Sequence, residues 1–123
     1  MLKELGLKIH ENNKSKGFYD SEKNIGEMLC LIHSEVSEAL ESDRKNKYAD
    51  LSTFNNREDE RQTDIEFQVD FQELIKDTFE DEMADIVIRV LDLCTFKGID
   101  IENHIKLKMQ YNSMRSHKHG KKY

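Results

Sequence analysis

Proline is absent from the 123 residues of this sequence, and runs of β-branched residues are scarce. The chain is therefore expected to be mostly helical, because proline breaks helices and β-branched residues favour strands. No stretch approaches the ~18 apolar residues of a membrane-spanning helix, and residues 1–20 lack the apolar region of a signal peptide. We expect a cytoplasmic protein that does not enter a membrane.

Cysteine is also rare. The two cysteines, Cys30 and Cys94, both lie within apolar helical patterns. Such residues in a cytosolic protein are expected to be reduced and part of the core. The pattern does not favour a disulfide or a zinc site.

The C-terminal segment contains no acidic residue. Residues 106–123 contain six Lys or Arg and no acid, whereas the preceding 105 residues carry 13 basic and 25 acidic groups. A protein that binds nucleic-acid polymers would be basic over a whole face, so this class is not expected. An acidic body with a basic C-terminal segment is compatible with a compact anion site beside a bound cation.

Apolar residues recur every three or four positions in four segments, which predicts helices over residues 2–16, 22–43, 77–97 and 101–114. Gly17 and Gly98 are expected to end the first and third helices, because glycine readily adopts the left-handed conformation. Asp20 or Ser21 is the expected N-cap of the second helix, and Asp100 that of the fourth.

Residues 44–70 are polar and are expected to form a long loop or insertion, with some helix towards residues 66–76. Ile65, Phe67, Val69 and Phe71 alternate as in a strand, but no partner strand is evident. The sequence thus predicts one all-α domain over residues 1–123, with an insertion at 44–70 and a basic segment at 106–123.

Four acidic residues form two pairs on the two most apolar helices. Glu35 and Glu38 lie in LIHSEVSEALE, and Glu82 and Asp85 lie in EDEMADIVIRVLDL. At 100° per residue, each pair falls on the same-handed border of its apolar stripe. If the two helices pack antiparallel, all four carboxylates line one groove.

Converging carboxylates repel one another, so they must be protonated or neutralised by a cation. Oxygen ligands alone favour a hard ion, best Mg²⁺, with Mn²⁺ as a possible substitute. A di-iron four-helix bundle is excluded because no Glu-x-x-His occurs. The alternative interpretation is that both pairs are solvated helix faces.

Other candidate residues carry positive charge or aromatic rings. Arg89 follows Asp85 by one helical turn, where it is either a phosphate ligand or a local ion-pair partner. In the basic segment, Lys108, Asn112 and Arg115 recur at helical spacing and are candidates to bind phosphate, or alternatively a solvated helix end. Phe18 and Tyr19 are weaker candidates to stack on a nucleotide base.

These features together resemble the MazG family of all-α nucleoside triphosphate pyrophosphohydrolases. Glu-x-x-Glu on one helix and Glu-x-x-Asp on a later one correspond to the two motif helices of that family. The ending YNSMRSHKHGKKY is similar to the Tyr-Asn-x-x-Arg…His-Gly-Lys ending of a MazG-like subgroup. The resemblance covers most of the chain.

The resemblance implies a four-helix core in homodimers or dimers of dimers, with Mg²⁺ held by Glu35, Glu38, Glu82 and Asp85. The implied reaction is hydrolysis of a (deoxy)nucleoside triphosphate to the monophosphate and pyrophosphate. The four acidic residues would also be the catalytic residues, with Glu38 or Glu35 as the base. The 43 residues between Glu38 and Glu82 are more than usual in the family, which leaves the closure of the pocket and the preferred base open.

Two alternatives remain open from the sequence. One keeps the fold and changes the substrate to phosphoribosyl-ATP or dUTP. The other is a helical interaction protein without enzymatic activity, whose basic segment binds an acidic partner.

Overall fold

The computed structural model describes Met1–Tyr123 and contains six α-helices and two short 3₁₀-helices, with no strand. The predicted all-α class is confirmed. The chain divides into two compact units: unit 1 comprises residues 1–22 and 90–123, and unit 2 comprises residues 23–89. None of the helices combines the length and the apolar character needed to cross a membrane.

Unit 1 contains α1 (Leu2–Ser15), the last part of α5 (Phe79–Phe96), α6 (Ile101–Ser113) and η2 (His117–Gly120). Helix α1 approaches α5 closely at Gly6, where an added Cβ would lie 2.7 Å from Oγ1 of Thr95. Gly98, with a φ of 68°, follows the end of α5 as expected. Asp100 caps α6 by accepting a hydrogen bond from the backbone N–H of Asn103 at 3.1 Å, also as expected.

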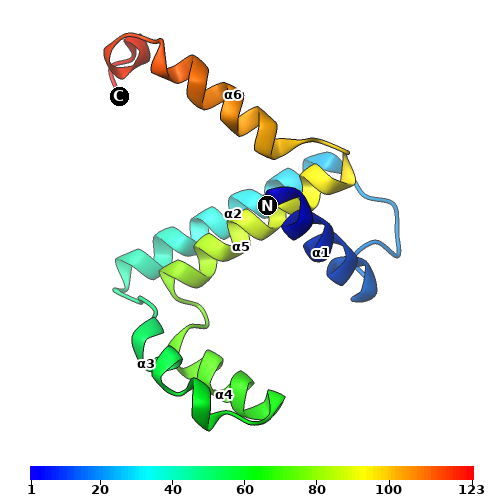
Figure 1. The fold of residues 1–123 in the computed structure, drawn as a ribbon, viewed down its shortest axis with the longest axis vertical. Coiled ribbons are helices and arrows are strands. Elements are labelled where there is room, and N and C mark those ends of the chain that lie inside the picture. The colour runs from blue at the N-terminus through cyan, green and yellow to red at the C-terminus, as the bar shows by residue number, and fades with distance from the viewer. The chain divides into compact units, whose positions relative to one another are not determined.

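Unit 2 contains α2 (Ile25–Arg44), α3 (Leu51–Asn56), η1 (Glu58–Glu60), α4 (Asp64–Leu74) and the first part of α5. Helix α2 and the first part of α5 run side by side in opposite directions, cyan and light green in Figure 1. The buried residues of α2 are Met28, Glu35, Ala39 and Ser42. Their spacing of seven, four and three residues defines a single stripe along the helix.

The predicted start of α2 was wrong. Neither Asp20 nor Ser21 is the N-cap, and the helix begins at Ile25. Asn24 is the N-cap, and its side-chain oxygen accepts a hydrogen bond from the backbone N–H of Glu27 at 3.1 Å. Asparagine is as good a cap as aspartate or serine, so the three candidates cannot be ranked from residue type alone.

The predicted long loop at residues 44–70 was also wrong. Asp50 and Thr63 cap α3 and α4 by accepting hydrogen bonds from the backbone N–H groups of Thr53 and Glu66. The backbone N–H of Asp50 donates to the carbonyl of Leu74 at 3.0 Å, which closes the two helices into a hairpin. The polar character of this segment reflects two short surface helices, not an unstructured connection.

The alternating apolar residues at 65–71 belong to helix α4 and not to a strand. Phe67 and Phe71 are one turn apart, and their ring centroids lie 5.5 and 6.5 Å from that of the buried Phe54. Ile65 and Val69, also one turn apart, are 72% and 56% exposed. The alternation therefore combines two helical faces, one packed and one exposed.

The two cysteines differ. Cys94 is buried, as expected, and burial raises the pKa of its thiol. The prediction of a core position for Cys30 was wrong, because this residue is exposed. At 100° per residue, Cys30 lies on the opposite side of α2 from the buried Met28 two residues earlier. Both thiols are free.

Candidate functional site

A glutamate occupies a core position on each of the two paired helices in unit 2. Glu35 lies in the buried stripe of α2 and is 7% exposed, and Glu82 on α5 is 6% exposed. Carboxylates are rarely buried to this extent unless they are paired or bind a metal. The burial of Glu35 and Glu82 therefore marks this part of the helix pair as a candidate site.

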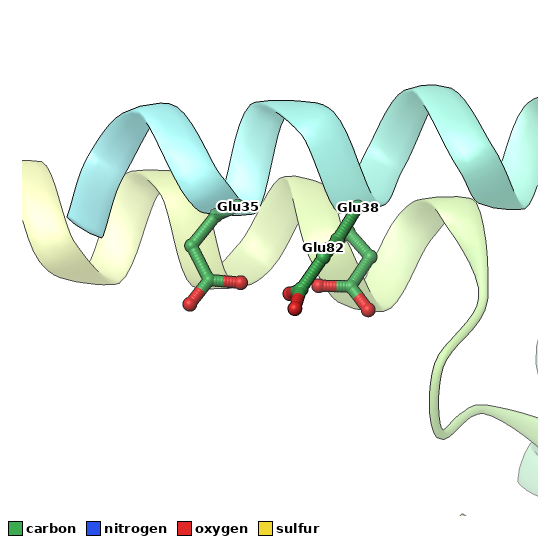
Figure 2. A group of neighbouring side chains, drawn as sticks. All are labelled: Glu35, Glu38 and Glu82. Carbon is green, nitrogen blue, oxygen red and sulfur yellow. The ribbon is translucent and has the colours of Figure 1, made fainter. Parts of the chain in front are cut away.

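Glu38 completes a group of three carboxylates with these two residues. One oxygen from each of Glu35, Glu38 and Glu82 lies within 4.8 Å of the other two. Figure 2 shows the three side chains directed to the same side of the α2–α5 pair. Glu38 is exposed, so the group reaches the surface. We refer to these three residues as the acidic triad.

Arg89 is the basic residue that pairs with the triad. Its Nε donates to Oε1 of Glu35 at 2.7 Å, a link between α5 and α2. The sequence allowed Arg89 to be either a phosphate ligand or the ion-pair partner of Asp85, but the structure pairs it with Glu35. Neither Glu38 nor Glu82 forms an ion pair, so the triad combines three carboxylates with one guanidinium.

The protonation of the triad reflects this imbalance. Burial, followed by the charge of Glu38, raises the pKa of Glu82 to about 7. The hydrogen bond with Glu35, followed by the negative charge of Glu35, raises the pKa of Glu38. Burial alone would raise the pKa of Glu35, but its hydrogen bonds with Arg89 and Glu38 lower it. Glu82 is thus only partly ionised near neutral pH, and a cation at the triad would compete with its proton.

Asp85 lies outside the group of three oxygens. Its side chain is partly buried, and its pKa is raised by burial and then by the charges of Asp81 and Glu35. The structure therefore brings together three of the four predicted metal ligands, with Asp85 close enough to interact electrostatically.

The donor set of the triad fits a hard divalent ion. All three donors are carboxylate oxygens, which suit Mg²⁺ or Mn²⁺ and not zinc or iron clusters. Two oxygens bound to one Mg²⁺ lie at most about 4.2 Å apart, twice the metal–oxygen distance. The three oxygens, which lie within 4.8 Å of one another, would have to draw together by on the order of 1–2 Å to surround one ion, a change within reach of side-chain rotation.

The predicted phosphate ligands of the basic segment belong to unit 1 and have local partners there. A guanidinium nitrogen of Arg115 donates to the side-chain oxygen of Asn112 at 3.2 Å, and another donates to the carbonyl of His119. The ammonium of Lys108 lies 5.2 Å from the ring centroid of Tyr111. The acidic triad belongs to unit 2. A role for these residues in phosphate binding stays a prediction.

The two aromatic candidates are also in unit 1. Phe18 is 58% exposed, whereas the Tyr19 hydroxyl donates to Oδ2 of the buried Asp92 at 2.7 Å. Nδ1 of His10 donates to the other oxygen of Asp92 at 2.9 Å. Burial and then the hydrogen bond to Asp92 raise the pKa of Tyr19. We call Asp92, His10 and Tyr19 the Asp92 network.

Comparisons of the chain with protein-family models, with curated proteins and with solved structures gave no match. The functional interpretation therefore depends on the residues and geometry of the site.

Proposed function

We propose that this protein is a Mg²⁺-dependent nucleoside triphosphate pyrophosphohydrolase of the MazG type. The observation that carries the proposal is the acidic triad: three carboxylates from two antiparallel helices converge, and two of them are buried. The helix pair that bears Glu-x-x-Glu and Glu-x-x-Asp supports the MazG-like fold within the all-α class. In this proposal α3 and α4 are an insertion between the two motif helices.

Glu35, Glu38 and Glu82 would hold the ion, and Asp85 would adjust the charge around them. The ion supplies charge neutralisation for phosphate oxygens and acidifies a bound water. The residues of the chain orient the triphosphate and remove a proton from the attacking water.

Glu38 is the best placed general base in this scheme. Glu35 is hydrogen-bonded to Arg89, which lowers its pKa and its basicity. Glu38 is exposed, and its neighbour Glu35 raises its pKa. Glu38 would accept the proton as the water oxygen bonds to phosphorus. The phosphoanhydride bond between the α- and β-phosphates then breaks, the displaced phosphate group leaves with the bonding electron pair, and the products are the monophosphate and pyrophosphate.

An exposed apolar surface supports the proposed homo-oligomer. Five large apolar residues of α2 and α5 in unit 2 expose between 43% and 50% of their surface: Leu29, Val36, Leu40, Met83 and Val87. By helical geometry they lie on the side of the α2–α5 pair away from Glu38. A second copy of the chain would cover this surface, as expected for large apolar patches. Sedimentation of wild-type protein and of a Leu40→Lys variant would test this.

The function is tested by incubating the protein with the eight common NTPs and dNTPs in the presence of Mg²⁺ and measuring pyrophosphate. We expect release with at least one substrate, and a loss of about 100-fold in Glu82→Gln and Glu38→Gln. Glu27→Gln is the matched control, because Glu27 is an exposed glutamate of the same helix outside the triad. Added dUTP and phosphoribosyl-ATP, with product analysis, separate the related hydrolases.

A purely structural helical protein would behave differently. Mg²⁺ that binds the folded state raises the free energy of unfolding, by about 2.7 kcal/mol at 100 times its Kd. Absence of pyrophosphate release with every substrate, together with no thermal shift at millimolar Mg²⁺, would reject the proposal.

A further inference from the structure

A groove of about 290 Å³ in unit 2 joins the acidic triad to a pair of lysines. Two of the triad carboxylates, Glu38 and Glu82, line it, and so do Lys45 and Lys47. Its remaining lining residues are Glu41, Ser42 and Asp77. No sequence pattern singled out these lysines, because they follow the end of a helix in a polar segment.

The backbone fixes Lys45 and Lys47 at this groove. Helix α2 ends in a Schellman motif: the N–H of Lys47 donates to the carbonyl of Ser42 at 2.9 Å, and that of Asn46 donates to Asp43 at 3.0 Å. Asn46 adopts a φ of 54°, the left-handed conformation that the motif requires. We refer to residues 45–47 as the two-lysine turn.

The two-lysine turn is also fastened to the start of α5. The N–H of Phe79 donates to the carbonyl of Lys47 at 2.8 Å, and the hydroxyl of Ser42 donates to the carbonyl of Asp77 at 3.1 Å. These hydrogen bonds hold the turn that carries the lysines at a fixed position relative to the helix that carries Glu82. Such preorganisation removes the cost of ordering the backbone of the turn when a ligand binds.

The charges that line the groove are both negative and positive, with the negative charges in excess. Four carboxylates line it beside the two ammonium groups, so the empty groove repels an anion. Lys45 is 3.5 Å from Glu41, whereas Lys47 has no ion-pair partner. Glu82, more than nine-tenths buried, receives no hydrogen bond from an N–H group and no ion pair. A divalent ion at the triad would offset the excess negative charge of the groove, so that the ion and the two ammonium groups could bind an anion together.

We infer that Lys45 and Lys47 bind the pyrophosphate part of the substrate, and that they do so only after a divalent ion occupies the acidic triad. This inference depends on the proposed function and adds to it the residues that hold the pyrophosphate. Lysine ammonium groups suit this task because they donate charge-assisted hydrogen bonds to phosphate oxygens. The predicted ligand Arg89, by contrast, is already bonded to Glu35.

The inference is tested by calorimetry with Mg²⁺ alone, with pyrophosphate alone, and with pyrophosphate at saturating Mg²⁺. We expect pyrophosphate to bind the wild-type protein only with Mg²⁺. Lys47→Ala should weaken that binding about tenfold, as for the loss of one hydrogen bond to a charged group, and the double variant with Lys45→Ala should weaken it further. Mg²⁺ affinity should stay within twofold of wild type.

Arg44→Ala is the matched control. Arg44 is the last residue of the same helix and pairs with the same Glu41 at 3.9 Å, but it does not line the groove. Its substitution should change pyrophosphate affinity less than twofold. Lys47→Arg, which keeps the charge, should restore most of the affinity. Circular dichroism verifies that each variant is folded.

The outcomes separate this inference from the proposed function. Normal Mg²⁺ binding with unchanged pyrophosphate affinity in the double lysine variant would overturn the inference and leave the hydrolase proposal intact. Equal binding of pyrophosphate without Mg²⁺ would overturn the dependence on the ion. Failure of the wild-type protein to bind Mg²⁺ would overturn both.

Discussion

Helix α5 carries two buried carboxylates with opposite surroundings: hydrogen-bond donors surround Asp92, and other carboxylates surround Glu82. Asp92 in unit 1 is 7% exposed and Glu82 in unit 2 is 6% exposed. Both oxygens of Asp92 accept a hydrogen bond, one from His10 and one from Tyr19. Glu82 instead lies beside two further glutamates, with a single arginine bonded to one of them.

This difference distinguishes a structural network whose hydrogen bonds are complete from a site with too little positive charge to balance its carboxylates. A buried carboxylate with every oxygen satisfied stabilises its own surroundings. Three carboxylates with one guanidinium remain unfavourable until a proton or a cation is added. Burial alone therefore does not mark a functional carboxylate, whereas an excess of carboxylates over basic groups around it does.

The largest expected effect comes from removing the completed network. Asp92→Ala leaves His10 and Tyr19 without their acceptor and should lower the free energy of unfolding by about 3 kcal/mol. Urea unfolding followed by circular dichroism measures this change. Asp59→Ala, at an exposed position of η1, should change stability by less than ~0.5 kcal/mol. Equal stability of the two variants would remove Asp92 from any structural role.

A smaller effect isolates one hydrogen bond of the same network. Tyr19→Phe keeps the ring, which packs against His10 and Phe96 at centroid distances of 4.6 and 5.4 Å, and removes only the hydroxyl. We expect a loss of about 1.5 kcal/mol in urea unfolding. The control is Tyr111→Phe, since the exposed Tyr111 hydroxyl makes no hydrogen bond. A loss as large as that of Asp92→Ala would mean that His10 contributes nothing.

The triad could be anticipated from the sequence because its determinants are local. Helical periodicity places Glu35 and Glu38 at one border of a stripe and Glu82 at the corresponding border of another. An antiparallel arrangement of the two helices is then enough to bring these carboxylates together. The helix ends at Gly98 and Asp100 were predictable for the same reason, since each depends on one residue with a strong conformational preference.

The features that escaped prediction depend on partners far apart in the sequence or on competing local signals. Asp92 is 82 residues from His10 and 73 from Tyr19, and no periodic pattern encodes such contacts. Some helix towards residues 66–76 was predicted and corresponds to α4. Helix α3 and the hairpin were missed, because the apolar residues of α4 lie on two helical faces that together mimic a strand. Lys47 became a candidate only when the groove placed it beside Glu82.

The triad should respond to substitution in the opposite direction from Asp92. Glu82→Gln removes one of three converging carboxylates and should raise the free energy of unfolding of metal-free protein at pH 8 by about 1 kcal/mol, because repulsion and desolvation are relieved. Glu27→Gln again provides the control. Urea unfolding in the presence of a chelator measures both. A loss of stability in Glu82→Gln would indicate that the triad is already satisfied within the chain.

The smallest expected effect is the pH dependence of metal-free stability. The pKa of Glu82 is raised from its ordinary value of 4.5 to about 7, so the folded state binds this proton more tightly than the unfolded state. The contribution of Glu82 to stability is therefore greatest below pH ~4.5. It falls as the pH rises towards about 7 and does not change above that pH. Glu38 contributes in the same direction. Between pH 6 and 8 we expect a decrease below about 1 kcal/mol, since solvent in the groove screens the charges.

The same measurement in Glu82→Gln isolates the contribution of the triad, because titrating groups elsewhere in the chain affect both proteins equally. The difference between the two pH slopes is the quantity of interest. Mg²⁺ should reverse the trend in the wild-type protein, because the ion competes with the proton and stabilises more at pH 8 than at pH 6. Identical slopes would show that Glu82 does not titrate between pH 6 and 8 in the folded protein, which would contradict the raised pKa of this carboxyl.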